Sequence, residues 1–371
     1  MKTITKKTTR TLTTAAALAV CGLLGAEAAD AAGLYRGPVT KDLVETSPGP
    51  KLTREVFSPS LPTPLPPPPA PQVYAALDGD GRLLVFGSNG ADDVTVLIDD
   101  TGSNLVRVYH DDDLIGSFPS SPMTRIKINL KNGDDTYFIG LEPGSSHKFT
   151  KEIDVRLGGG DDSGFVDFRG TTSNAIVQGS LEISVIGGSG EDEAIAHFAR
   201  KHGGKLVFLC NMQGHADQCS ASMWGDITGG ADVKFDLRGG GGADNLWSWN
   251  TYDQKDGAYS DIRITGDSTF DIKMAGGAGP DDLTPTYAGE VDGKLTLTVK
   301  GQSGGDESYG VVDLGGNSGG QVKAKTLGAA GSDDLRLDVF GTAPTLNAKI
   351  NGGFGVDTCQ STPNVSKVSC P

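Results

Sequence analysis

The sequence predicts an all-β protein, a right-handed parallel β-helix or β-solenoid of about ten rungs. Three observations predict this fold: a glycine turn recurs along residues 73–371, strands with a two-residue apolar period flank it, and no helical pattern competes. Glycine makes up 54 of the 371 residues, well above the usual ~7%, which suits a chain of many tight turns. Only 6% of the residues are aromatic, so the core must be built mainly from small and aliphatic side chains.

The recurring turn reads Gly-x-x-Gly-x-Asp, usually followed by Asp, Glu or Asn. Two copies, Lys131–Asp135 and Gly158–Asp162, are one residue shorter, and Gly214–Asp217 is a degenerate copy. The commonest spacing between copies is 25 to 27 residues, and glycine supplies the positive φ that a tight turn needs. The complete copies are Gly87–Asp92, Gly187–Asp192, Gly239–Asp244, Gly276–Asp281, Gly301–Asp306, Gly328–Asp333 and Gly352–Asp357.

Each turn lies between two short strands. Apolar residues alternate before the glycines, as in Ile126–Leu130, and again after the Asp, as in Val94–Ile98 and Leu335–Val339. A unit of this size cannot bury its apolar face alone, so successive units must stack with matching strands ~4.8 Å apart. The turns then lie above one another and their acids form a ladder. Longer intervals leave room for loops around Tyr109–Pro122 and Thr251–Tyr259.

The first 72 residues differ in composition from the repeats. Residues 1–31 combine a basic head, a short apolar stretch at Leu12–Leu24 and small-x-small sites, which predicts a secretory signal peptide. An alternative is a lipoprotein signal that ends in a lipidated Cys21. Residues 32–72 hold 11 of the 19 prolines and predict a disordered proline-rich linker. The protein is thus expected to be secreted, extracellular or at the cell surface.

The charge balance restricts the partners. Without residues 1–31 the chain carries 28 Lys plus Arg and 45 Asp plus Glu, a net charge of −17. Nucleic-acid binding needs a basic surface, so nucleic acid is not an expected partner. No apolar run reaches the ~18 residues of a membrane-spanning helix. The acidity instead favours cations.

The cysteines fit an oxidising compartment. Besides Cys21 there are four, at positions 210, 219, 359 and 370, which predicts two disulfides with three connectivities. The simplest is local, Cys210 with Cys219 and Cys359 with Cys370. The first bridge would then staple the degenerate turn, and the second would tie down the C-terminal end of the stack. A zinc site from His202, Cys210, His215 and Cys219 is the alternative, although its spacing matches no standard finger.

Two copies resemble the hemolysin-type, or RTX, calcium-binding nonapeptide Gly-Gly-x-Gly-x-Asp-x-aliphatic-x. They are Gly239–Trp247 and Gly276–Thr284. In that family the nonapeptides form a parallel β-roll that binds calcium in its turns. Family members place the nonapeptides in tandem, whereas here one copy occurs per ~27 residues. The resemblance implies several calcium ions along one edge of the stack.

Electrostatics also favours a cation at the turns. Two carboxylates ~5 Å apart repel by about 0.8 kcal/mol in water and by more near a protein surface. Calcium takes 6 to 8 oxygen ligands in flexible geometry. The alternative is that each Asp only forms the turn and stays solvated. The candidate calcium ligands are Asp92, Asp93, Asp134, Asp135, Asp161, Asp162, Asp192, Asp244, Asp281, Asp282, Asp306, Asp333, Asp334 and Asp357.

Two classes of function remain. The first is a non-enzymatic, calcium-binding surface, matrix or adhesion protein, whose partners would include extracellular polysaccharide or cell-surface components. The second is a polysaccharide lyase or hydrolase on a parallel β-helix. Paired acids that recur in nearly every rung are typical of a scaffold, so we expect no catalytic residues. The best unique cluster is Trp247, Trp249 and Tyr252 beside Asp244 and Asp253, where rings could stack on sugars or simply form the wall of the solenoid.

Overall fold

The structure confirms the predicted fold class. The computed structural model describes residues 72–99, 102–142, 150–169, 176–177, 179–198, 201–250, 262–315 and 318–370. These residues form strands, turns and bends without a helix, so no helix among them could span a membrane. The expected signal peptide, nearly all of the proline-rich linker, and the Thr251–Tyr259 loop with Tyr252 and Asp253 lie outside the described residues.

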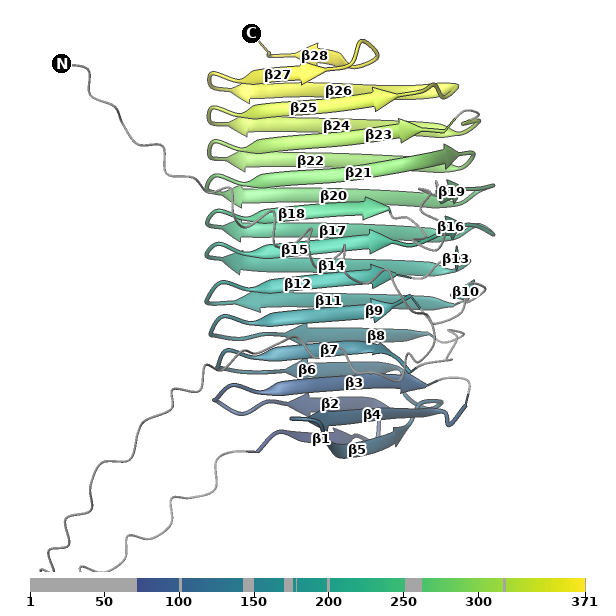
Figure 1. The fold of residues 1–371 in the computed structure, drawn as a ribbon, viewed down its shortest axis with the longest axis vertical. Coiled ribbons are helices and arrows are strands. Elements are labelled where there is room, and N and C mark those ends of the chain that lie inside the picture. The colour runs from purple at the N-terminus through teal and green to yellow at the C-terminus, as the bar shows by residue number, and fades with distance from the viewer. Residues whose placement is uncertain are drawn as a thin grey trace, which may run out of the picture. The chain divides into compact units, whose positions relative to one another are not determined.

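The strands form two sheets, and the chain crosses from one to the other at each glycine turn (Figure 1). Sheet A has 12 strands and sheet B has 16. Sheet A contains β1 (Tyr74–Leu77), β2 (Arg82–Phe86), β6 (Arg125–Asn129), β8 (Lys151–Arg156), β11 (Ser180–Gly188), β14 (Lys205–Gly214), β17 (Asp232–Gly241), β20 (Thr269–Ala278), β22 (Lys294–Ser303), β24 (Gln321–Ala330), β26 (Thr345–Phe354) and β28 (Ser366–Val368).

Sheet B contains long strands, which begin after the glycine turns, and short strands, which lie near the ends of the long strands away from the turns. Its strands are β3 (Asp93–Asp99), β4 (Leu105–His110), β5 (Asp113–Pro119), β7 (Thr136–Leu141), β9 (Ser163–Phe168), β10 (Ile176–Val177), β12 (Glu193–Phe198), β13 (Lys201–His202), β15 (Gln218–Met223), β16 (Asp226–Ile227), β18 (Asn245–Asn250), β19 (Ile262–Ile264), β21 (Asp282–Val291), β23 (Glu307–Leu314), β25 (Asp334–Phe340) and β27 (Thr358–Ser361).

The parallel stack forms a β-solenoid of about eight turns, slightly fewer than the ten predicted. The difference lies at the ends. After β3 the chain makes the antiparallel strands β4 and β5, and the last strands, β27 and β28, are short. The glycine-turn junction itself occurs ten times, from β2/β3 to β26/β27. The predicted Tyr109–Pro122 loop is instead largely the β4–β5 hairpin.

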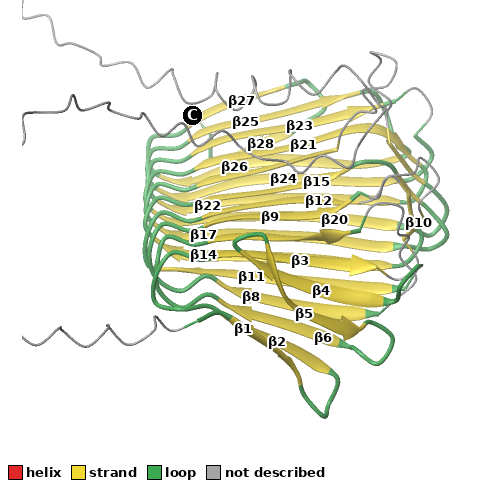
Figure 2. Ribbon diagram, turned by 60° about the horizontal axis from the view of Figure 1, so that its bottom comes forward, coloured by secondary structure: helices red, strands yellow, loops and turns green. Residues whose placement is uncertain are grey.

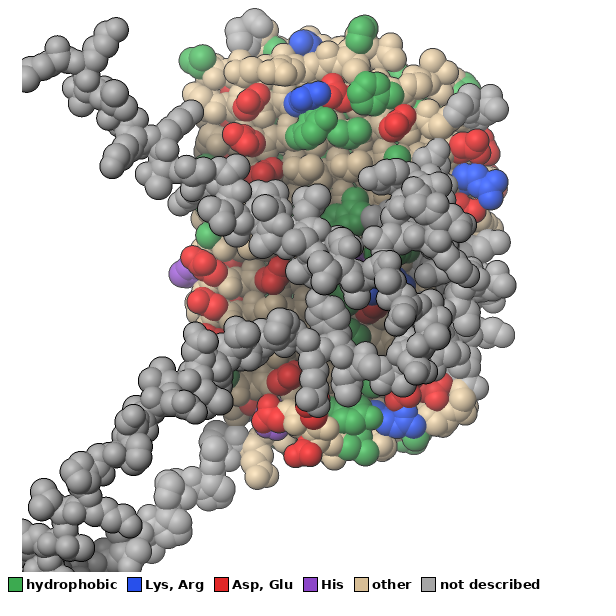
Figure 3. Space-filling model, viewed as in Figure 1, with side chains coloured by type: hydrophobic (Ala, Val, Ile, Leu, Met, Phe, Trp, Pro, Cys, Tyr) green, Lys and Arg blue, Asp and Glu red, His purple; other side chains and the backbone are tan. Residues whose placement is uncertain are grey.

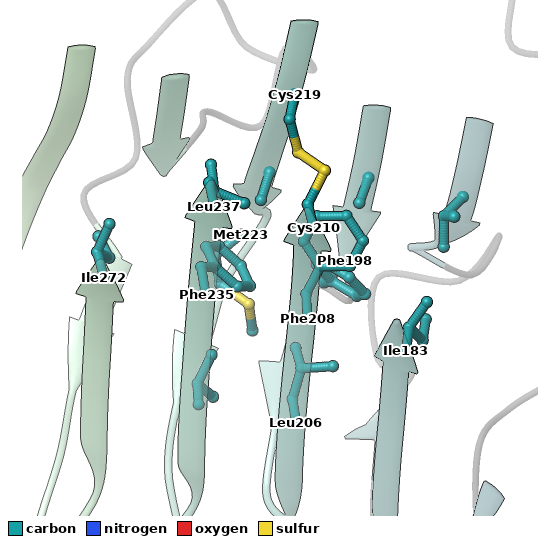
Figure 4. Packing of buried hydrophobic residues seen from close by; sticks show 14 of the residues in the cluster. Ile183, Phe198, Leu206, Phe208, Cys210, Cys219, Met223, Phe235, Leu237 and Ile272 are labelled. Atoms are coloured by element: carbon teal, nitrogen blue, oxygen red, sulfur yellow. A yellow bond between two sulfur atoms is a disulfide. The ribbon is translucent and has the colours of Figure 1, made fainter. Parts of the chain in front are cut away.

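Stacking in register places equivalent side chains above one another. Ile183 of β11 pairs with Phe208 of β14, which pairs with Phe235 of β17. Alternate residues of both sheets point into a core that is largely aliphatic, as the composition predicts. Aromatic rings gather locally around Phe198 and Phe235, whose ring centroids lie 5.4 Å apart (Figure 4).

Both predicted local cysteine pairs lie at disulfide distance. Cys210 and Cys219 are joined inside the core and link β14 to β15 across the degenerate turn (Figure 4). Cys359 and Cys370 are joined at the C-terminal end. In this structure the two sulfur atoms of the alternative zinc site are bonded to each other.

Candidate functional site

The glycine turns form one continuous edge of the solenoid (Figure 2). Each turn has six positions, counted from the first glycine of Gly-x-x-Gly-x-Asp to the Asp. The fourth position has positive φ in nine of the ten turns, and it is glycine in all but one of these nine. The exception is His215 of the degenerate turn, with φ of 93°. The backbone shape of the turn is thus kept even where its glycine is lost.

The sixth residues form a buried ladder of aspartates. In each pair of successive turns, the backbone N–H of one Asp donates to Oδ1 of the Asp in the next turn, over 2.8 to 3.2 Å. All ten carboxyl groups belong to residues that are at most 5% exposed. We call these the ladder aspartates: Asp92, Asp135, Asp162, Asp192, Asp217, Asp244, Asp281, Asp306, Asp333 and Asp357.

The ladder corrects the alignment of two turns. In the copies that looked one residue short, the ladder residues are Asp135 and Asp162, not Asp134 and Asp161. Both turns have the full six positions, with Leu130 and Leu157 in place of the first glycine, and both leucines are buried in the core. The ladder also includes Asp217, which was absent from the candidate ligands because its turn lacks the glycine signature.

In seven turns the first position is glycine, and there the ladder carboxylate leaves no room for a larger side chain. A Cβ added at Gly239 would lie 2.1 Å from Oδ2 of Asp244, and one added at Gly276 would lie 2.2 Å from Oδ2 of Asp281. Glycine is therefore the residue whose backbone can lie against the carboxylate.

Burial changes the acidity of the ladder. It raises the pKa of Asp135 and Asp306 to about 6, and that of Asp162, Asp217 and Asp281 to about 7, although the hydrogen bond from the preceding backbone opposes the change. In each of these five residues Oδ2 is buried and has no hydrogen-bond partner. The ladder is thus a column of poorly solvated acids.

Asp92 is the first ladder residue, so no preceding turn donates a backbone N–H to its carboxylate. Oδ1 of Asp92 instead accepts a hydrogen bond from the Ser88 hydroxyl over 2.9 Å, and Nε2 of His110 lies 3.3 Å from it. His110 comes from β4, so the hairpin covers this end of the ladder.

The remaining candidate ligands face solvent. Asp93, Asp134, Asp161, Asp282 and Asp334 are exposed, and acids are visible along the edge formed by the turns (Figure 3). Asp93 pairs with Thr136, whereas the others form rows with acids of neighbouring turns. Glu191 donates its backbone N–H to Oδ1 of Asp161, which in turn donates to Asp134, and Glu307 lies in register between Asp282 and Asp334.

No group of three or more acid, His or Cys side chains in the described part of the chain lies close enough together to hold a metal ion. Comparison with protein-family models, curated proteins and solved structures gave no match. The resemblance to hemolysin-type repeats therefore stays an expectation from the turn residues alone.

A second feature lies on the outward face of sheet B, where aromatic side chains follow one another across the strands. Centroids of neighbouring rings lie 4.8 to 6.3 Å apart. Alternation along the strands places these residues opposite the core, and each is half-buried. We call this row the aromatic strip: Phe138, Phe165, His197, Trp224, Trp247 and Trp249. The predicted cluster of Trp247 with Asp244 does not form, because Asp244 is buried in the ladder.

Register brings Asp167, His197 and Ser222 side by side on β9, β12 and β15. Along the chain His197 has no catalytic residue near it, because Asp167 and Ser222 lie one repeat away on each side. The hydrogen bonds are nevertheless not those of a catalytic triad. Both carboxylate oxygens of Asp167 are held by Arg169, and the Ser222 hydroxyl accepts a hydrogen bond from Nε1 of Trp224 over 2.8 Å.

Charge in this region is balanced. Burial raises the pKa of Asp167, but the hydrogen bonds and charge of Arg169 outweigh it and hold the pKa below its ordinary value. Burial lowers the pKa of His197 to about 4, so the imidazole is neutral near pH 7. The guanidinium of Arg169 also lies 4.7 Å from the ring centroid of Trp224. Among the described residues, the charges next to His197 therefore cancel.

Proposed function

We propose that the protein is a secreted or cell-surface structural protein with an adhesive or matrix role. One observation carries this proposal: the aspartate of each glycine turn but the last makes the same hydrogen bond to the next turn. Identical use of one side chain in nine of the ten turns supports a scaffold, since an active site needs a unique set of groups. The expected signal peptide supports export.

We include calcium binding in the proposal. The positions of the carboxylate oxygens favour one set of aspartates over the other as ligands. The ladder aspartates use Oδ1 on backbone amides and press Oδ2 against the first glycine of the turn. The outward rows are better candidates, because their oxygens are exposed and their neighbours are carboxylates. Calcium there would offset the repulsion between successive acids.

A calcium titration of the full chain tests this part. We expect saturable stabilisation in thermal melts, reversed by chelator, and a weaker effect in the double variant Asp282→Asn with Asp334→Asn. Asp313→Asn, which removes another acid of sheet B, is the matched control and should respond like the unaltered protein. An unchanged melting temperature over millimolar calcium would exclude calcium stabilisation.

A screen for cleavage of extracellular polysaccharides, with and without calcium, tests the enzymatic alternative. A scaffold releases no new reducing ends or unsaturated products. Turnover by the purified chain would replace the structural proposal with an enzymatic one.

A further inference from the structure

We infer that the aromatic strip is a binding surface for a neutral polysaccharide chain. The inference deepens the proposed adhesive role by naming its partner, and it rests on that role only in placing the protein outside the cell. The argument depends on where the rings lie and what charge the surface carries.

The rings form a continuous surface rather than separate contacts. Phe138 stacks on Phe165 at 5.9 Å, and Phe165 meets His197 at 4.8 Å. His197 then reaches Trp249 across β15, where the ring centroids are 6.1 Å apart. The row crosses from β7 to β18, four strand spacings, or about 19 Å at ~4.8 Å each. Its long direction is along the stack, which suits a linear polymer better than a small ligand.

All three tryptophans of the chain lie in this strip. Trp247 and Trp249 lie two residues apart on β18 with their rings nearly parallel, at an interplanar angle of 13°. Large flat rings on a surface give apolar contact area at low entropic cost, and sugar rings present flat faces of C–H groups that suit such contact. Elsewhere the outward positions of sheet B are more polar: β21 has Asp282, Thr284 and Thr286, and β25 has Arg336 and Asp338 beside a single ring, Phe340.

Unpaired polar atoms accompany the rings. Ser220 lies in register between Ile195 and Trp247, is fully buried, and its hydroxyl has no hydrogen-bond partner. Nδ1 of His197 is also buried without a partner. Both atoms are out of reach of a surface ligand in this structure, so the inference rests on the rings and on the charge around them.

The charge of the protein favours one class of polysaccharide over another. Among the described residues, the charged groups that act on His197 are the paired Asp167 and Arg169, and His197 itself is neutral. The rest of the chain is strongly acidic and repels an anionic polymer. A neutral chain such as a glucan or mannan therefore fits this surface, and an acidic one does not.

Intrinsic tryptophan fluorescence of the unaltered protein tests the inference directly, because every tryptophan lies in the strip. The probes are hydroxyethyl cellulose, galactomannan and soluble starch, with alginate as the acidic comparison. We expect a saturable change in emission with at least one neutral polymer and none with alginate. No change with all three neutral polymers, or a change with alginate alone, would overturn the inference.

Variants assign the binding to these rings. In affinity electrophoresis, replacing Trp247 and Trp249 together with Ala should weaken retardation by the neutral polymer at least tenfold. Phe at both positions keeps the rings and should retain most of the binding, which also separates ring loss from misfolding. Tyr309→Ala is the matched control, since Tyr309 is an exposed ring on β23 outside the strip. An equal loss of binding in the Tyr309→Ala control, or no loss in the Trp variants, would refute the site. The calcium and cleavage experiments test the structural role separately, so their results would not change.

Discussion

At the scale of single residues, the repeated shape of the turn depends on two positions that are usually glycine, the fourth and the first, and these have different roles. The fourth position gives the backbone its positive φ, and where His215 replaces glycine the same conformation is held by an L-residue. The first position gives room for a carboxylate, as the close approach of Gly239 and Asp244 shows. A substitution at the first position tests its contact with the carboxylate.

Gly239→Ala should destabilise the protein by about 1–3 kcal/mol, because the added methyl group overlaps the Asp244 carboxylate. Gly241→Ala in the same turn is the matched control: its Cβ would meet nothing closer than 3.9 Å, and its φ is not positive. Urea unfolding of both variants measures the difference. Equal stability would show that the first glycine is not required by the carboxylate.

At the scale of elements, the ladder connects the turns of the solenoid through buried acids. Folding transfers these carboxyl groups from water to a site where, in seven of the ten, Oδ2 is buried without a partner, so the ionised form is disfavoured. The ladder therefore specifies the register of the turns while making the fold sensitive to the ionisation of its acids.

Stability should fall as the pH rises from about 4 to about 7. The folded pKa values of about 6 to 7 exceed the ordinary value near ~3.9, so the stabilising contribution is complete below pH ~4 and is lost as the pH passes through the folded pKa values. Thermal melts in chelator over this range measure the slope.

Two variants distinguish the ladder from the general effect of net charge. Asp281→Asn keeps an acceptor for the backbone N–H of Asp244 and should flatten the slope. Asp282→Asn removes the neighbouring exposed acid and should leave the slope unchanged. Equal slopes in both variants would show that the ladder acids are not the source of the pH dependence.

At the scale of the whole molecule, each turn contacts only its neighbours, so stability propagates along one dimension. The two disulfides lie at different places along the stack of turns. Cys210–Cys219 lies in the middle of the stack and inside its core, whereas Cys359–Cys370 holds the last strands, β27 and β28. Their loops are similar in length, with sequence separations of 9 and 11, so position should decide their effects.

Replacing Cys210 and Cys219 with Ala should lower the global stability by roughly 2–4 kcal/mol, the usual contribution of a disulfide. Replacing Cys359 and Cys370 should loosen chiefly the C-terminal strands, since few neighbours depend on them. Hydrogen exchange followed by mass spectrometry separates the outcomes. Uniform loss of protection in the C-terminal variant would contradict the one-dimensional description.

The sequence by itself determined the all-β class and the stacked turns, and it favoured the local cysteine pairing among three possible connectivities. Period-two strands and a recurring glycine turn are local signals, and short loops favour local disulfides. The acid ladder also followed from the repeat, because stacking places equivalent residues above one another.

Tertiary structure alone decided the phase of the repeat. Leu130 and Leu157 occupy the position that is glycine in most turns. A count that starts from the first acid of these two copies, Asp134 or Asp161, therefore places them one residue out of phase with the ladder. A shift of one residue exchanges the two faces of a strand. With the phase set by hydrogen bonds between turns, Phe138 and Phe165 fall three residues after their ladder aspartates, as Trp247 does after Asp244. The aromatic strip therefore depends on contacts between residues about one repeat apart, which only the packed solenoid brings together.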